Sequence, residues 1–288
     1  MGTLYLVSTP IGDPEDITLR ALRVLRSVSL VAAQRAPDAA RMLAGYAIQV
    51  PCIAYHEHNR LARLDEVLAA LEQGDVALVA GEGTPVLAAP GVELVNACVV
   101  AGHRVVPVPG PNAPLAALVA SGLPADQFLC LGALPPRRAQ RRALLQRLAD
   151  LSATLVGFEE PHRLCDTLED LLAILGDRRL ALAHDVTRRG EGFFRGRIAQ
   201  ALAHYAEHRP RGLFTLVVEG HHWREGLGDD QELPSEAEVA ARLRQLRDQG
   251  RSGSAAARQV ARELGLRKSL VYQVWLSLGE PAHEGGEV

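Results

Sequence analysis

Short apolar runs alternate with amphipathic helical patterns along the first part of the chain. Residues 61–71, for example, repeat leucine and valine three and four positions apart and stop before Gly74, as a surface helix does. A repeated succession of strand and helix predicts an α/β domain built on a largely parallel sheet. The expected strands lie at 3–8, 28–33, 50–55, 75–80 and 103–108, and the expected helices at 19–25, 38–46, 61–71 and 91–101.

The alternation resumes after Ser-Gly-Leu-Pro at 121–124, which interrupts it. A second, mixed α/β domain is predicted there, followed by a polar linker at 221–234. The predicted domains are 1–120, 121–222 and 235–288, the last of them small and helical. Its helices and glycine turn fit either a helix-turn-helix-like unit or a docking tail. The expected strands lie at 128–134, 154–158, 180–184 and 213–219. One expected helix follows the turn at 159–163 and ends at 175, and the others cover 197–206, 236–249, 254–264 and 269–278.

Composition narrows the class of protein only slightly. The chain has 288 residues, of which 48% are hydrophobic and 23% charged, as in ordinary globular proteins of more than one domain. A net charge of −3 argues against binding nucleic acid through bulk charge, although local basic clusters stay possible. The four cysteines form no C-x-x-C pair, which favours reduced thiols in the cytoplasm. We expect no signal peptide and no membrane span.

Two stiff loops follow predicted strands of the first domain. Residues 81–91 (GEGTPVLAAPG) combine glycines, which reach unusual backbone angles, with prolines, which fix theirs. Residues 109–113 (PGPNA) show the same combination of glycine and proline before a predicted helix of small residues. Loops at the carboxyl ends of parallel strands are where open α/β sheets bind ligands. We therefore expect both loops to form walls of one cleft.

Other polar clusters allow more than one interpretation. Residues 56–59 (HEHN) contain two histidines but no third ligand at metal-binding spacing, so no metal is expected. The arginine-rich segment 137–142 fits either a solvated helix face or a patch that contacts phosphates. The polar turn at 159–163 fits helix capping and salt bridging as well as a functional role. No Walker A, G-x-G-x-x-G or G-x-S-x-G motif is present.

Several segments carry a resemblance to one known family. They are, in order, Gly2–Leu25, Tyr55–Asn59, Gly83-Thr84-Pro85, Pro90-Gly91, Pro109–Ala113 and Glu160–Leu164. Together they resemble the ribosomal RNA small subunit methyltransferase I family of the tetrapyrrole methylase superfamily. The match runs in order over about residues 2–220, and its opening segment is specific. The helical tail resembles the small C-terminal domain of that family.

This resemblance implies two α/β domains of tetrapyrrole-methylase type that hold S-adenosylmethionine between them. It also implies a homodimer that methylates the 2′-hydroxyl of a cytidine ribose in 16S ribosomal RNA. The cofactor-binding residues expected from it are Pro10, Gly81, Glu82, Gly83, Thr84, Pro85, Asn112, Ala113 and Phe158. The RNA-binding residues expected are Arg137, Arg138, Arg141, Arg142, Arg163 and Arg188.

The chain departs from the family pattern where that pattern places acids. The family has Ala-Glu-Asp-Thr-Arg at 33–37, and this chain has Ala-Gln-Arg-Ala-Pro. Two family aspartates correspond to Gly81 and Ala89, although Glu82 lies beside the first. The family's Arg-Glu-Leu-Thr-Lys corresponds to His-Asp-Val-Thr-Arg at 184–188.

Two hypotheses of function follow from the resemblance and these departures. The first is an active methyltransferase, in which a side chain accepts the proton of the ribose hydroxyl. The candidates for that role are Glu82, Glu159 and Asp185. The second is a catalytically lapsed relative that serves as a cofactor- or RNA-binding scaffold, since a fold does not establish a function. Methylation of a porphyrin has only the superfamily in its favour.

Overall fold

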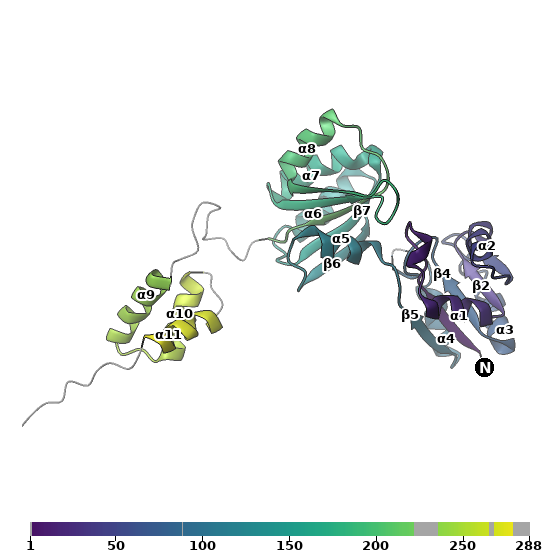
Figure 1. The fold of residues 1–288 in the computed structure, drawn as a ribbon, viewed down its shortest axis with the longest axis horizontal. Coiled ribbons are helices and arrows are strands. Elements are labelled where there is room, and N and C mark those ends of the chain that lie inside the picture. The colour runs from purple at the N-terminus through teal and green to yellow at the C-terminus, as the bar shows by residue number, and fades with distance from the viewer. Residues whose placement is uncertain (1, 88, 222–235, 265–267, 279–288) are drawn as a thin grey trace, which may run out of the picture. The chain divides into compact units, whose positions relative to one another are not determined.

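The computed structural model describes residues 2–87, 89–221, 236–264 and 268–278 of the chain. The chain divides into two compact units, Met1–His221 and His222–Val288. The first unit contains two five-stranded sheets, and the described part of the second is helical (Figure 1). The predicted division of the first unit at residue 120 stays a prediction.

The first sheet consists of five parallel strands in the order β3-β2-β4-β1-β5. Its central strand β4 is buried along its whole length, which explains its unbroken apolar sequence. Because all the strands are parallel, their carboxyl ends meet at one edge, together with the loops that follow them. The strands are β1 (Thr3–Val7), β2 (Leu30–Ala33), β3 (Cys52–Ala54), β4 (Val76–Val79) and β5 (Arg104–Val108).

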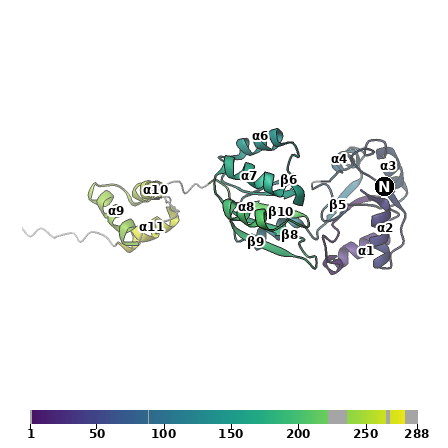
Figure 2. The same cartoon turned by 90° about the horizontal axis from the view of Figure 1, so that it is seen from above.

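Helices cover both faces of this sheet. Leu25 and Leu43 bring α1 and α2 onto one face, and Leu71 and Leu94 bring α3 and α4 onto the other (Figure 2). The Thr18 hydroxyl caps α1 by accepting a hydrogen bond from the Ala21 N–H at 3.0 Å. The helices are α1 (Leu19–Ser27), α2 (Ala36–Gly45), α3 (Leu64–Gln73) and α4 (Val92–Val100), with a 3₁₀ turn, η1, at Pro14–Asp16.

The second sheet is mixed, in the order β6-β7-β10-β8-β9. Only β6 and β7 pair in parallel; the other neighbours are antiparallel. The edge strand β9 is absent from the sequence prediction because its sequence, GFFRGR, lacks both an apolar run and an alternating pattern. The strands are β6 (Phe128–Ala133), β7 (Thr154–Glu159), β8 (Arg179–His184), β9 (Gly192–Arg197) and β10 (Phe214–Val218).

Each face of the second sheet has its own apolar core. Leu145, Leu168 and Ile198 attach α6, α7 and α8 to one face. The other face packs on Ala117 and Leu118 of α5, so this helix begins within the predicted residues 1–120 but packs against the second sheet. The helices are α5 (Ala113–Ser121), α6 (Arg138–Leu148), α7 (Leu164–Leu175) and α8 (Ile198–Glu207), with a 3₁₀ turn, η2, at Pro161–Arg163. The predicted α/β fold class is confirmed.

The second unit folds around an apolar core of its own. The core contains Leu243 of α9 (Glu236–Asp248), Val260 of α10 (Gly253–Glu263) and Val271 of α11 (Lys268–Ser277). The predicted linker 221–234 lies outside the described residues except for its first residue. None of the helices in the described parts of the chain combines the length and the apolar character that a bilayer span requires.

Candidate functional site

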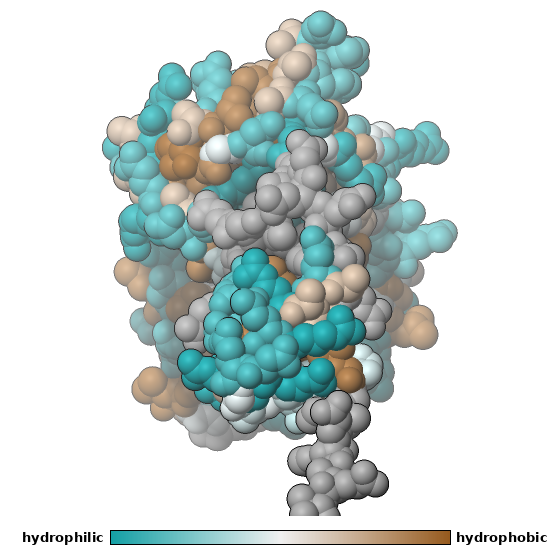
Figure 3. Space-filling view, turned by 90° about the vertical axis from the view of Figure 1, so that its left-hand side faces the viewer, coloured by the Kyte–Doolittle hydropathy of each residue, from teal (hydrophilic) through white to brown (hydrophobic). Residues whose placement is uncertain are grey.

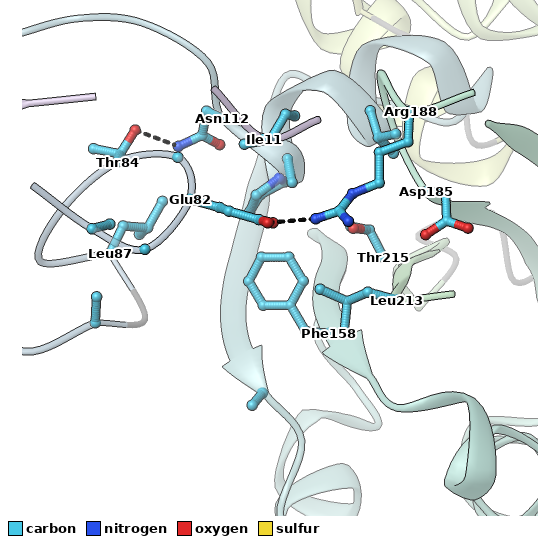
Figure 4. A pocket seen from close by; sticks show the side chains of 18 of the residues that line it. Ile11, Glu82, Thr84, Leu87, Asn112, Phe158, Asp185, Arg188, Leu213 and Thr215 are labelled. Carbon is cyan, nitrogen blue, oxygen red and sulfur yellow. Dashed lines mark hydrogen bonds and ion pairs between the residues drawn. The ribbon is translucent and has the colours of Figure 1, made fainter. Parts of the chain in front are cut away.

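The loops after β4 and β5 meet the second sheet around one pocket of about 230 Å³ (Figure 4). Its volume lies just below the range of about 300–1,000 Å³ that is usual for pockets that bind small organic molecules. Its lining residues are Ile11, Gln34, Ala80, Gly81, Glu82, Gly83, Thr84, Leu87, Ala89, Asn112, Ala113, Pro114, Ala133, Phe158, Asp185, Val186, Arg188, Leu213 and Thr215. The prediction that both stiff loops form walls of one cleft is therefore confirmed.

Gly83 fixes the β4 loop against the loop after β1. Its carbonyl accepts a hydrogen bond from the Thr9 N–H at 2.9 Å, and its N–H donates to the Thr9 carbonyl at 3.1 Å. Its φ of +74° is a conformation that favours glycine. A Cβ there would also lie only 3.3 Å from Cγ2 of Ile11. Any larger residue would therefore strain this wall of the pocket.

Thr84 and Asn112 join the two stiff loops to each other. The Asn112 Nδ2 donates to the Thr84 hydroxyl at 3.2 Å, and that hydroxyl also lies 3.1 Å from the Ser8 Oγ. The Asn112 Oδ1 accepts a hydrogen bond from the Leu115 N–H at 3.0 Å and so caps α5. Both side chains are thus occupied in holding the loops, so the loops offer a ligand their main-chain groups other than those of Gly83, which pair with Thr9.

The opposite wall is the turn after β8. Arg188 in this turn reaches across to Glu82 and forms an ion pair of 2.5 Å (Figure 4). Asp185 and Thr187 have φ values of +50° and +63°, which are strained for residues with a Cβ. The Thr187 Oγ1 accepts a hydrogen bond from the Asp13 N–H at 3.0 Å. Contacts with loops of the first sheet therefore hold this turn in an unusual conformation.

Asp185 is the acid of the pocket that forms no ion pair with any residue in the described ranges. Within the described part of the chain, nothing donates a hydrogen bond to its carboxylate. A Cβ on Gly212 would lie 2.3 Å from its Oδ2, so only glycine at 212 leaves room for the carboxylate. Figure 4 shows Asp185 set apart from the pair formed by Glu82 and Arg188. The Glu82 Oε1, in contrast, already accepts from the guanidinium.

Glu159, the third predicted proton acceptor, does not line the pocket. It is only 1% exposed, and its carboxylate accepts hydrogen bonds from the Thr167 hydroxyl at 2.6 Å and the Arg163 Nε at 2.8 Å. The Glu160 N–H donates to it as well, at 2.8 Å. Glu159 therefore holds the turn after β7, and the same ion pair occupies Arg163, a predicted RNA-binding residue.

The arginine-rich start of α6 is largely an internal charge network. Arg141 is only 2% exposed and donates to the Asp170 carboxylate from Nε and Nη2, at 2.9 and 2.7 Å. Arg138 and Arg142 donate to the other oxygen at 3.1 and 2.9 Å. Arg141 is therefore buried rather than free for a phosphate. Among the described residues, Arg137 is the one arginine of the predicted four without an ion pair.

This network changes the acidity of Asp170. Burial alone would raise the pKa of its carboxyl, but the hydrogen bonds from Arg142, Arg141 and Arg138 outweigh burial and hold the pKa below its ordinary value of 3.8. The hydrogen bond with Asp170 also raises the pKa of Arg138. The cluster thus stays ionised at neutral pH and joins α6 to α7.

Most of the predicted cofactor-binding residues line the pocket, but Pro10 and Pro85 do not. Sequence reasoning missed the apolar lining residues Ile11, Leu87 and Leu213, which carry no motif and become neighbours only in the fold. Four positions lack the acids of the family pattern. Three of them, Gln34, Gly81 and Ala89, line the pocket, whereas Arg35 does not. No group of residues in the described ranges has the composition and spacing of a metal site.

Comparison with known proteins defines the class first. The family model of Tetrapyrrole (Corrin/Porphyrin) Methylases matches residues 3–202. A solved structure of uroporphyrin-III-C-methyltransferase from Thermus thermophilus shares the fold, with a TM-score of 0.55 and 30% identity over 76% of this chain and 94% of that one.

More similar relatives then narrow the family. A protein of Synechocystis sp. called ribosomal RNA small subunit methyltransferase I is 41% identical over 96% of this chain and 99% of its own length. A protein of Micromonospora olivasterospora with the same name is 42% identical over 94% of this chain and 86% of its own. The chain therefore belongs to the ribosomal RNA small subunit methyltransferase I family of tetrapyrrole methylases, which confirms the predicted resemblance.

Proposed function

We propose that this protein transfers a methyl group from S-adenosylmethionine to the 2′-hydroxyl of a cytidine ribose in 16S ribosomal RNA. The observation that carries the proposal is the similarity to relatives named as methyltransferases of small-subunit ribosomal RNA, at 41–42% identity over 94–96% of the chain. The porphyrin-methylating relative is less similar and covers less of the chain. The RNA is therefore a better-supported substrate than a porphyrin.

The residues of the pocket fit the proposed methyl donor. Main-chain groups of 81, 82, 84 and 112–113 offer hydrogen bonds to its polar parts, and Phe158 and Leu213 offer apolar surface to its adenine ring. When bound, S-adenosylmethionine supplies an electrophilic methyl group on a sulfonium cation. The absence of a side chain at Gly83 keeps this wall open, since a Cβ there would press on Ile11.

Asp185 is the proposed proton acceptor. A ribose hydroxyl must lose its proton as it takes the methyl group, and a carboxylate at the pocket can accept it. Asp185 lines the pocket without a bound cation, whereas the Glu82 Oε1 is occupied by Arg188 and Glu159 lies outside the pocket. The reaction then leaves a methylated ribose, a protonated carboxyl and neutral S-adenosylhomocysteine.

The proposed assembly is a homodimer that works in the cytoplasm, where ribosomal subunits are made. Exposed apolar side chains support an interface between copies, because such residues in groups mark contact surfaces. They occur on α4, where Val99 and Val100 are exposed, and on α5, where Val119 is. Light scattering on the purified protein measures this directly: a monomer mass at micromolar concentration would contradict the dimer.

A labelled-methyl assay tests the proposed function. Small ribosomal subunits that lack the modification are incubated with the protein and tritiated S-adenosylmethionine, and the RNA is digested to nucleosides. The label is expected in 2′-O-methylcytidine. The substitutions Gly83→Ala and Gly176→Ala provide a matched pair, because both glycines have a positive φ but Gly176 has open space around it. Only Gly83→Ala should reduce the label.

Two results of this assay would contradict the proposal. Label in a base rather than a ribose would leave a methyltransferase with a different acceptor atom. Binding of S-adenosylmethionine without any turnover would instead support the lapsed scaffold, and the losses at Gln34, Gly81 and Ala89 would then be its cause. Restoring acids by Gly81→Asp and Ala89→Asp should recover turnover in that case.

A further inference from the structure

We infer that the hydroxyl of Thr215 binds the adenosine half of S-adenosylmethionine. The inference rests on the proposed function and deepens it, because it assigns one side chain of the second sheet to one part of the cofactor. Thr215 lies on β10 and lines the pocket. The roles given above to the stiff loops and to the acids of the pocket do not involve this residue.

The Thr215 side chain is buried without a hydrogen-bond partner. Polar side chains commonly lie at the surface, where water completes their hydrogen bonds, as on the largely hydrophilic face in the foreground of Figure 3. Thr215, in contrast, is only 3% exposed. Within the described ranges, no group donates a hydrogen bond to its hydroxyl or accepts one from it. A buried hydroxyl without a partner is unfavourable, and a ligand in the adjoining pocket can provide that partner.

Thr154 shows how a buried threonine of the same sheet is satisfied within the protein. It is 1% exposed at the start of β7, and its hydroxyl donates to the Pro124 carbonyl at 2.6 Å. The residues of β10 other than Thr215 are buried and apolar. A valine at position 215 would suit such a strand and would remove the unpaired hydroxyl. The sequence therefore places a hydroxyl where packing alone favours an apolar side chain.

The register of the strands places this hydroxyl beside the apolar surface proposed for adenine. Thr215 pairs directly with Phe158 of β7 in the antiparallel ladder. Side chains of directly paired residues lie on the same face of a sheet, with Cβ atoms about 4.5–5.5 Å apart. Leu213 precedes Thr215 by two positions and shares this face by alternation. Figure 4 shows Thr215 beside Leu213, across the pocket from Thr84 and Leu87.

The chemistry of the two halves of the cofactor decides which of them meets this hydroxyl. The amino-acid half carries a carboxylate and an ammonium group, which suit the charged side chains of Glu82 and Arg188. The adenosine half is neutral, and its base and ribose both have hydrogen-bonding atoms. A threonine hydroxyl can donate one hydrogen bond and accept others. A neutral hydroxyl beside Phe158 and Leu213 therefore suits the adenosine half.

Calorimetry with two ligands and matched threonine variants of the full-length protein tests the inference. S-adenosylhomocysteine contains both halves, whereas 5′-methylthioadenosine keeps the adenosine half and lacks the amino-acid half. Thr215→Val removes the hydroxyl and keeps the shape of the side chain, and Thr215→Ser keeps the hydroxyl. Thr154→Val is the matched control, because it makes the same change in the same sheet outside the pocket. Thermal unfolding checks the fold of each variant: Thr154→Val should lower the midpoint because it breaks a hydrogen bond, and Thr215→Val should not.

Thr215→Val should bind both ligands about tenfold more weakly, as the loss of one hydrogen bond predicts. Thr215→Ser should recover most of this loss, and Thr154→Val should keep the wild-type affinities. Unchanged binding by Thr215→Val, or equal losses in Thr215→Val and Thr154→Val, would overturn the inference and leave the proposed function standing. So would a weaker affinity for S-adenosylhomocysteine alone, because the hydroxyl would then contact the amino-acid half. Failure of the wild-type protein to bind either ligand would overturn the proposed function together with the inference.

Discussion

Two carboxylates of the second sheet region, Asp170 and Asp185, have opposite surroundings. Asp170 lies inside the contact between α6 and α7 and accepts hydrogen bonds from three arginines. Asp185 lies at the pocket, and nothing among the described residues donates to its carboxylate. A charge saturated by partners stabilises the fold, whereas an acid without partners is available for a proton or a ligand. The difference assigns Asp170 to stability and supports Asp185 as the proposed proton acceptor.

Removing the charge of Asp170 should have the largest effect on the free energy of unfolding. Asp170→Asn leaves buried Arg141 without its counter-charge, and breaking a buried pair in this way costs about 3–5 kcal/mol of unfolding free energy. Urea unfolding measures the loss. Glu169→Gln is the matched control, because that exposed acid touches only Arg138, and its loss should cost less than about 1 kcal/mol. Equal stabilities of the two variants would refute the structural role of Asp170.

Low pH should weaken the contacts between Asp170 and its three arginines. The pKa of Asp170 is lower in the folded protein than its ordinary value of 3.8, so its contribution is complete well above that pH. The contribution declines as the pH falls below 3.8 and is lost once the pH passes the lowered pKa. The wild-type protein should therefore lose stability more steeply in this range than Asp170→Asn does. Parallel urea titrations at several acidic pH values check this, and identical slopes would count against it.

Removing the charge of Asp185 should spare the fold and slow the reaction. Loss of a general base reduces the rate by about 10²–10⁴-fold. Asp185→Asn keeps the shape of the side chain, so the affinity for S-adenosylmethionine should change little. Single-turnover methylation with Glu82→Gln as the comparison separates the two acids of the pocket. A greater loss of rate in Glu82→Gln would transfer the role of proton acceptor to that residue.

Breaking the ion pair between Glu82 and Arg188 should have the smallest effect on the stability of the protein. Both side chains are about half exposed, and such pairs contribute less than about 1 kcal/mol and weaken with salt. A double-mutant cycle with Glu82→Gln and Arg188→Ala measures their coupling through thermal unfolding. A coupling of several kcal/mol that does not weaken with salt would contradict this and show that the pair stabilises the contact between the two walls of the pocket.

Sequence reasoning predicted the parallel sheet and the two pocket loops because their signals are local. The buried strand β4 is a continuous apolar run, and the glycines and prolines of residues 81–91 and 109–113 restrict the backbone wherever they occur. The strand β9 was missed because pairing with β8, rather than its own sequence, makes it a strand.

The role of the α6 arginines was beyond local reasoning. Asp170 lies 29 residues after Arg141 in the sequence, and only the packing of α7 on α6 brings the two together. In the same way, the distinction between Asp185 and Glu159 depends on which partners surround each acid. A pattern of charges along a chain predicts that a group is polar, but the fold determines whether it is already neutralised.

Calorimetric titration of Thr84→Trp tests whether the pocket formed by the two stiff loops holds S-adenosylmethionine. The indole would fill the space beside Asn112, and Leu19→Trp places the same ring at an exposed position as the control. Circular dichroism confirms that both variants are folded. The wild-type protein and Leu19→Trp should bind the cofactor with equal affinity, and Thr84→Trp should show no binding. Unchanged affinity in a folded Thr84→Trp would place the cofactor outside this pocket.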